Sequence, residues 1–225
     1  NNMYMQTFIL PSLLAADFGK LESEILRAEN AGADAIHLDI MDGVFVPNIS
    51  FGPAIVKLCK KITKLPLHVH LMLARPDFFV EPFAKAGATT IQIHAEASCN
   101  IKATLQQIRD YGVSPALVLN PLTSHTAAIP YLKLVDEIMY MTVFPGYGGQ
   151  KFKPEPLQEI KMLRSYANAN GFDRLNIAVD GGIDKDTIKQ CAQAGANVFI
   201  AGTSLFSKQD MAQEIALFKQ ITDKQ

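Results

Sequence analysis

The sequence predicts a single-domain (β/α)₈ barrel of the α/β class, also called a TIM barrel. Three observations predict it: a repeated phrase, an alternation of strands and helices, and the position of the polar residues. The phrase Ala-Gly-Ala begins at Ala31, Ala86 and Ala194, each time between a helix-like stretch and a β-rich run. A glycine that ends a helix just before a strand is typical of such a connection. Gly112 and Gly171 occupy the same place in poorer matches.

The alternation of elements runs through the whole chain. Eight apolar, β-rich runs are expected to be strands: Phe8–Ser12, Ala35–Met41, Leu67–Leu73, Thr90–Ala95, Ala116–Asn120, Glu137–Val143, Asn176–Asp180 and Val198–Gly202. Helix-like stretches lie between them: Lys20–Asn30, Ala54–Lys61, Phe78–Lys85, Ile101–Tyr111, Pro154–Asn168 and Lys185–Ala192. Residues Ser207 to Asp210 resemble a capping box that opens the last helix. Without a linker or low-complexity segment, these units fit one domain over residues 1–225.

The polar residues of the strands separate the barrel from its alternative, a doubly wound open sheet. Those that are unusual in a buried strand all stand at its C-terminal end: Ser12, Asp39, His70, His94, Asn120 and Asp180. A barrel gathers these ends on one face, where its loops form the active site. An open sheet would spread them over both sides of its switch point. The distribution therefore favours the barrel.

Composition excludes several classes of function. The net charge of −1 provides no basic field for nucleic acid or anionic lipid, and there is no apolar run long enough for a spanning helix. Three widely spaced cysteines predict reduced thiols in a cytoplasmic protein: Cys59, Cys99 and Cys191. Residues 1–6 form a polar extension without the features of a signal peptide. Asn1 and Asn2 precede a plausible start at Met3, and we interpret them as left over from cloning.

Four residues at strand ends predict a metal site with acid/base capacity. In the segment from His37 to Gly43, alternation places His37 and Asp39 on one face of a strand, and His70 and Asp180 end two further strands. Two imidazoles and two carboxylates suit zinc, iron(II), manganese or cobalt better than calcium or magnesium. We expect one divalent ion per subunit, with zinc or iron(II) favoured.

The other histidines and methionines of the strands have simpler interpretations. His68 lies deeper in its strand and is expected to be a hydrogen-bonded core residue, as is His94 unless it lines the pocket. Met139 is interpreted as core filling. The remaining methionines near the strand ends are expected to form an apolar floor that keeps water from a reactive intermediate: Met41, Met72 and Met141.

Glycine-rich loops follow the last three strands. They are Pro145-Gly146-Tyr147-Gly148-Gly149-Gln150, Gly181-Gly182 and Gly202-Thr203-Ser204. Loops with free backbone N–H groups bind anions, and barrels place phosphate at the last two strands. We therefore expect a phosphate site here, and the first loop is long enough to be a lid.

These parts together fit proton transfer at a carbon next to the carbonyl of a sugar phosphate. Removing such a proton leaves an enediolate, whose charge a divalent cation can stabilise. One carboxylate on each side of its plane can remove the proton from one face and return one to the other, which inverts the centre. Metal binding and burial must then keep both acids near a useful pKa.

Several strings of this chain resemble the ribulose-phosphate 3-epimerase family. They are Pro11-Ser12, His37 to Gly43 with Phe45 to Asn48, His70 to Met72, Asn120-Pro121, Met141 to Val143 with Pro145 to Gln150, and Val179 to Gly182. The resemblance runs in order from about Phe8 to Phe206. It implies a metal-dependent barrel that interconverts D-ribulose 5-phosphate and D-xylulose 5-phosphate in the pentose phosphate pathway. It further implies a homo-oligomer, either a dimer or a hexamer.

The resemblance also implies roles for individual residues. His37, Asp39, His70 and Asp180 would bind the metal. Asp39 and Asp180 would be the two acid/base residues, and Ser12 and His70 would contact the substrate. The substrate, chiefly its phosphate, would be held by Gly146, Tyr147, Gly148, Gly149, Gly181, Gly182, Gly202 and Thr203. Two positions depart from the family's usual pattern: Phe144 replaces a polar or acidic residue, and Thr203 replaces the commoner serine.

Three other functions compete with this one. The nearest is an epimerase for a six-carbon ketose phosphate, D-allulose 6-phosphate, although Gly181-Gly182 and the loop through Tyr147 look more like the pentose enzyme. Metal-assisted hydrolysis of a phosphate ester is disfavoured because no second metal cluster is visible. The last is a non-catalytic barrel that binds a phosphosugar around a structural metal.

Overall fold

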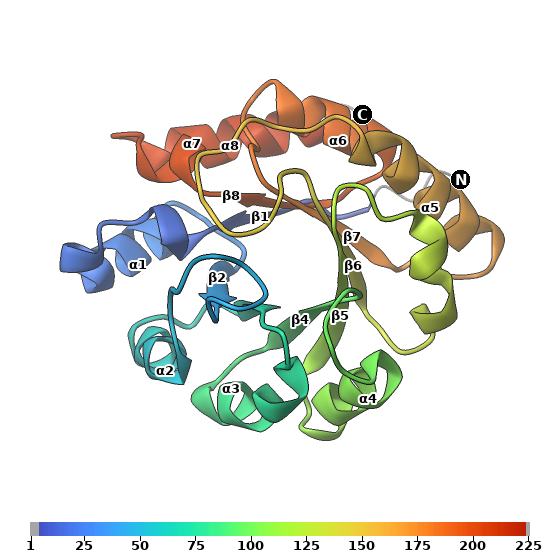
Figure 1. The fold of residues 1–225 in the computed structure, drawn as a ribbon. Coiled ribbons are helices and arrows are strands. Elements are labelled where there is room, and N and C mark those ends of the chain that lie inside the picture. Colours follow the sequence, from blue (N-terminus) through green and yellow to red (C-terminus); the bar gives the residue numbers. More distant parts are fainter. Residues whose placement is uncertain (1–4, 224–225) are drawn as a thin grey trace.

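The computed structural model of the chain describes residues 5–223, which form one barrel of eight parallel strands (Figure 1). The strands are β1 (Phe8–Pro11), β2 (Ile36–Met41), β3 (Leu67–Met72), β4 (Thr90–His94), β5 (Ser114–Leu119), β6 (Glu137–Met141), β7 (Asn176–Asp180) and β8 (Val198–Ala201). They pair in the order β1-β8-β7-β6-β5-β4-β3-β2, and a parallel bridge between Ser12 and His37 joins β1 to β2. The predicted barrel is confirmed.

Helices surround the strands as an outer ring (Figure 1). They are α1 (Leu21–Asn30), α2 (Pro53–Ile62), α3 (Val80–Ala86), α4 (Ile101–Asp110), α5 (Pro156–Ala169), α6 (Thr187–Ala194), α7 (Thr203–Phe206) and α8 (Met211–Thr222). Short 3₁₀ turns supplement them: η1 (Leu13–Ala15), η2 (Phe18–Lys20), η3 (Pro76–Phe78), η4 (His125–Ala127) and η5 (Ile129–Tyr131). Between β5 and β6 there are only η4 and η5, so the fifth unit of the described chain has no α-helix.

The glycines predicted to end helices do so. Gly32, Gly87 and Gly195 follow α1, α3 and α6 with φ values of 84°, 111° and 110°, in the left-handed region where a side chain is unfavourable. The capping box predicted at residues 207–210 is wrong. Ser207 follows α7, and α8 is capped by Asp210, whose side chain accepts a hydrogen bond from the backbone N–H of Gln213.

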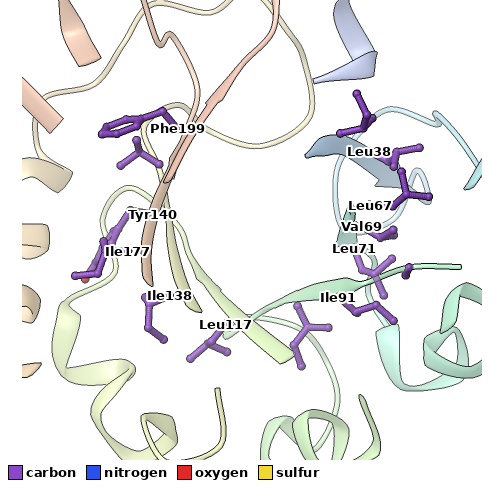
Figure 2. Close-up of a cluster of buried hydrophobic side chains, with 14 of the residues drawn as sticks. Leu38, Leu67, Val69, Leu71, Ile91, Leu117, Ile138, Tyr140, Ile177 and Phe199 are labelled. Carbon is purple, nitrogen blue, oxygen red and sulfur yellow. The ribbon is translucent and has the colours of Figure 1, made fainter. Parts of the chain in front are cut away.

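Alternation along each strand divides the apolar side chains into two layers. Outward-facing residues such as Leu38, Val69 and Phe199 fill the space between barrel and helices (Figure 2). Inward-facing residues such as Val118 and Ile200 form a second, smaller cluster inside the barrel. Because the period is two, the same alternation turns the polar residues of the strands into the barrel.

Two expectations concern the ends of the chain and its thiols. Asn1, Asn2 and Met3 lie outside the described residues. Within residues 5–223, no helix combines the length and the apolar character that crossing a bilayer requires. The three cysteines are free thiols that are buried or half-buried: Cys59, Cys99 and Cys191.

Candidate metal centre

Three strands bring the four predicted metal ligands together at the C-terminal end of the barrel. The register of β2 and β3 sets Asp39 beside His70, and β2 contributes His37 two residues earlier on the same face. Asp180 is the last residue of β7. One ligating atom from each of the four residues lies within 4.8 Å of the other three.

One ring nitrogen of each histidine lies close to one carboxylate oxygen of each aspartate. Nε2 of His37 lies 3.1 Å from Oδ1 of Asp39 and 3.5 Å from Oδ2 of Asp180. Nδ1 of His70 lies 3.1 Å and 3.6 Å from the same two oxygens. The hydroxyl of Ser12 donates a 2.6 Å hydrogen bond to Oδ2 of Asp39, which leaves Oδ1 of Asp39 for the ligand cluster.

The electrostatics of this cluster favour a positive charge at its centre. Burial alone would lower the pKa of His37, but the carboxylates of Asp39 and Asp180 raise it to about 10. Burial would raise the pKa of Asp39, and His37 and His70 instead hold it well below its usual range. Two imidazole nitrogens and two carboxylate oxygens fit a divalent transition metal, which can supply this charge in place of protons. The four residues therefore fit the predicted metal.

A cavity of about 430 Å³ lies above these residues. Apart from His37 and His70, every residue predicted for the site lines it: Ser12, Asp39, Met41, Met72, Met141, Gly146, Tyr147, Gly148, Gly149, Asp180, Gly181, Gly182, Gly202 and Thr203. His37 and His70 are fully buried beneath it. The expected contact of His70 with the substrate therefore stays a prediction.

The three methionines predicted to form an apolar floor are part of the cavity lining. Met41 and Met72 pack with Val46, which belongs to the loop after β2, and Met141 extends the inner cluster of the barrel. All three methionines are at most 4% exposed, although they line the cavity. Val46 was not predicted, because nothing in the sequence showed that its loop folds back over the barrel.

Glycine is required in the loop after β7. Gly181 and Gly182 have φ values of 121° and 65°. A Cβ on Gly181 would lie 2.9 Å from the backbone nitrogen of Val143, and one on Gly182 would lie 2.7 Å from that of Phe152. Both contacts are closer than real Cβ atoms show, so the loop after β7 packs against the neighbouring loop through its bare backbone.

The predicted lid, residues 145–150, is fastened to the loop after β2. The side-chain amide of Asn48 donates a 2.9 Å hydrogen bond to the carbonyl of Gly146. The hydroxyl of Tyr147 donates a 2.7 Å hydrogen bond to the carbonyl of Pro47. Gln150 closes the loop on itself by donating to the carbonyls of Phe144 and Tyr147. These contacts hold the lid against the rim of the cavity.

The two positions that depart from the pattern of the resembled family are Phe144 and Thr203. Phe144 is 45% exposed, and the ammonium of Lys153 lies 4.7 Å from its ring centroid, within the range of a cation–π contact. Thr203 is the first residue of α7 and lines the cavity.

Two polar contacts near the metal centre were not predicted from the sequence: that of His94 with His70 and that of Gln92 with Glu137. His94 does not line the cavity: it is fully buried with Nε2 2.8 Å from Nε2 of His70, and burial lowers its pKa to about 4. Deeper in the barrel, the amide of Gln92 donates a 2.7 Å hydrogen bond to Glu137. The inward period of β4 could have indicated Gln92 and His94, but not their partners on other strands.

Comparison with known proteins adds the relatives of this chain. Residues 8–206 match the family described as "Ribulose-phosphate 3 epimerase family". Proteins named ribulose-phosphate 3-epimerase from Bacillus subtilis and Synechocystis are 43% and 45% identical to it. The first alignment covers 92% of this chain and 96% of the relative, and the second covers 92% and 91%. The protein of that name from Escherichia coli K12 is 39% identical, with 93% of each chain covered.

Solved structures show the same fold at lower identity. KGPDC from Streptococcus mutans, solved as a ligand complex, aligns with a TM-score of 0.73 at 16% identity and covers 96% of this chain and 97% of its own. A thiamine phosphate pyrophosphorylase from Pyrococcus furiosus aligns with a TM-score of 0.66 at 14% identity, covering 98% and 96%. The family match and the identity to the curated relatives show that this chain belongs to the ribulose-phosphate 3-epimerase family.

Proposed function

We propose that this protein is a metal-dependent epimerase that interconverts D-ribulose 5-phosphate and D-xylulose 5-phosphate. Family membership supports the reaction, since the curated relatives carry the name ribulose-phosphate 3-epimerase. One observation in the structure carries the proposal. The carboxylates of Asp39 and Asp180 converge on His37 and His70, and both carboxylates line the same cavity.

In this proposal the two carboxylates exchange one proton each with C3 of the ketose. Asp39 is held as a carboxylate by its histidine neighbours, which is the form that accepts a proton. When one of the two residues, as a carboxylate, removes the proton of C3, the other, which starts as the carboxylic acid, donates its proton to the opposite face of the planar enediolate, and the configuration inverts. The reverse reaction exchanges the two roles.

The metal is proposed to bind between the four ligands His37, Asp39, His70 and Asp180. A divalent cation held by these residues would supply the positive charge that stabilises an enediolate. Ser12 orients Asp39 through its 2.6 Å hydrogen bond. Zinc or iron(II) is favoured among zinc, iron(II), manganese and cobalt, because two of the ligands are imidazoles.

The remaining cavity residues are proposed to hold the substrate. Gly181, Gly182, Gly202 and Thr203 lie at the ends of β7 and β8, where barrels of this class bind phosphate. Met41, Met72 and Met141 give the sugar an apolar floor that offers no competing proton donor. The lid, with Gly146 to Gly149, covers the cavity.

The test is the conversion of ribulose 5-phosphate, followed by NMR and by a coupled assay for xylulose 5-phosphate. We expect efficient conversion, and at least about 100-fold less in Asp39→Asn and Asp180→Asn, since general acid/base groups contribute 10²–10⁴-fold. Variants that keep near wild-type activity would contradict the two-base mechanism.

The same assay with D-allulose 6-phosphate separates the pentose from the hexose enzyme. We expect a clear preference for the pentose phosphate, and a preference for the hexose would overturn this choice of substrate. Binding of ribulose 5-phosphate with no exchange of its C3 proton would instead support a non-catalytic barrel. Release of inorganic phosphate would support a hydrolase.

Two expectations concern the protein in the cell. We propose that the protein is a cytoplasmic homo-oligomer, either a dimer or a hexamer, with no nucleic-acid or membrane partner. The family resemblance supports the oligomer. Light scattering coupled to size-exclusion chromatography distinguishes the monomer, dimer and hexamer.

A further inference from the structure

A chain of polar contacts leaves the metal centre through His70 and ends on Glu96. The rings of His94 and His70 are nearly parallel, inclined by 25°, and their centroids are 5.0 Å apart. Nε2 of His94 lies 2.8 Å from Nε2 of His70, and Nδ1 of His94 lies 3.4 Å from Oε2 of Glu96. His70, His94 and Glu96 do not line the cavity.

The far end of this chain is fixed by the loop after β5. Oε1 of Glu96 accepts hydrogen bonds from the backbone N–H of Asn120 and from the hydroxyl of Thr123. Both donors hold Glu96 as an ionised carboxylate, which can only accept hydrogen bonds. Its second oxygen, Oε2, lies 3.4 Å from Nδ1 of His94, a buried nitrogen that makes no hydrogen bond within the described residues, so a proton on Nδ1 would face this carboxylate. Phe45 packs on the ring of His94 at a centroid distance of 4.7 Å and fixes its position.

We propose that His94 and Glu96 are positioning residues that fix the tautomer of His70 for metal binding. One proton fits between the two Nε2 atoms. A carboxylate beside Nδ1 favours the tautomer of His94 that carries its proton there, so that Nε2 of His94 is an acceptor and the shared proton belongs to Nε2 of His70. In the metal-loaded protein, Nδ1 of His70 then carries no proton and is the nitrogen that binds the cation. The inference rests on the metal centre proposed above.

The substitution Glu96→Gln reverses the direction in which protons are donated along these contacts, and it keeps a side chain of the same length. The backbone N–H of Asn120 can only donate, so the amide oxygen of the new side chain faces it, and the amide NH₂ faces His94. Nδ1 of His94 then accepts, its proton moves to Nε2, and His70 is left with its proton on Nδ1. Binding of Zn²⁺ must displace that proton.

We therefore expect Glu96→Gln to weaken Zn²⁺ binding by about 10- to 100-fold, as loss of a partner behind a metal ligand does elsewhere. Competition with a chromophoric chelator measures the affinity. His94→Phe, which keeps a ring against His70 and Phe45, should show a similar loss. Glu96→Asp keeps a carboxylate and should recover part of the affinity. A purely structural role would not separate the Asp variant from the Gln variant in this way.

Elsewhere the protein contains a matched control for Glu96→Gln. Nδ1 of His125 lies 2.6 Å from Glu159 in a second histidine–carboxylate pair, and neither residue lines the cavity. Glu159→Gln makes the same chemical change away from the metal centre, and we expect its Zn²⁺ affinity to stay within about twofold of wild type. Equal affinities of wild type and Glu96→Gln would overturn the inference, whereas wild-type protein that binds no Zn²⁺ would overturn the metal centre itself.

A measurement on the wild type needs no variant to fold. Long-range ¹H–¹⁵N NMR of the Zn²⁺-loaded protein reports which ring nitrogen of each histidine is protonated. We expect the proton of His70 on Nε2 and that of His94 on Nδ1. A proton on Nε2 of His94 would contradict the proposed direction of the chain.

Discussion

At the scale of single residues, the site is built from charges that need one another. The imidazoles of His37 and His70 and the carboxylate of Asp39 are buried, and a buried charge without a partner would be very costly. Each is instead within 3.1 Å of an opposite partner, and the hydroxyl of Ser12 satisfies the remaining oxygen of Asp39. The result is a preformed cluster of donors directly below the cavity.

Glu137 differs from these residues because its partner, Gln92, is neutral. It is 3% exposed, and burial raises its pKa from 4.5 to about 7. Between these two pH values the folded chain keeps a proton that the unfolded chain has released, so this residue makes stability fall as the pH rises. A shift of this size corresponds to about 3 kcal/mol.

Glu137→Gln removes this titration and keeps the shape of the side chain. At pH 8 we expect the free energy of unfolding in urea to be up to about 3 kcal/mol higher in the variant. The difference should shrink toward zero as the pH falls below the ordinary pKa of the carboxyl, because the side chain is then neutral in both the folded and the unfolded chain. A difference that does not change with pH would show that Glu137 is already ionised in the folded barrel.

At the scale of elements, the loop after β2 and the lid act as one unit at the rim of the cavity. Tyr147→Phe removes the hydrogen bond to Pro47 and changes nothing else in the side chain. A hydrogen bond of this kind contributes about 0.5–1.5 kcal/mol, so the lid should close about two- to tenfold less often. We expect kcat/KM for ribulose 5-phosphate to fall by that factor, mainly through KM.

Tyr131→Phe is the control for this prediction, because Tyr131 lies in η5 and does not line the cavity. It should leave kcat/KM unchanged. If Tyr147→Phe also left kcat/KM unchanged, the contact with Pro47 would not govern closure of the lid.

Sequence patterns predicted the elements well because their signals are local. Alternation and helix-ending glycines such as Gly87 depend only on nearby residues, and so the strands and the direction of His37, Asp39 and His70 could be predicted. The cap of α8 was misplaced because two polar residues, Ser207 and Asp210, both suit a cap. Contacts between strands, such as those of His94 with His70 and of Glu137 with Gln92, depend on the register and shear of the closed barrel. No local pattern encodes them.

At the scale of the whole molecule, the residues that stabilise the barrel are different from those at its proposed reactive site. Its apolar residues pack in an outer and an inner layer, while the polar ends of β2, β3 and β7 share one face. The rigid barrel therefore holds the ligands in place before any cation binds.

Removal of metal is expected to abolish activity and leave the barrel folded. A chelator should eliminate epimerisation of ribulose 5-phosphate, with circular dichroism unchanged, and adding back zinc, iron(II), manganese or cobalt one at a time should identify the metals that restore it. The restoring metal should raise Tm, since a ligand at 100 times its Kd adds about 2.7 kcal/mol of stability. Full activity in chelated, metal-free protein would contradict a role for the metal.

The central claim is that Asp39 and Asp180 act on opposite faces of one carbon, and proton exchange at C3 in deuterated water tests it most directly. By NMR, wild-type protein should deuterate C3 of both ribulose 5-phosphate and xylulose 5-phosphate while interconverting them. Asp39→Asn should retain exchange with one of the two epimers, Asp180→Asn should retain exchange with the other, and neither should interconvert them. Interconversion by either variant, or exchange of the same epimer by both, would contradict the claim.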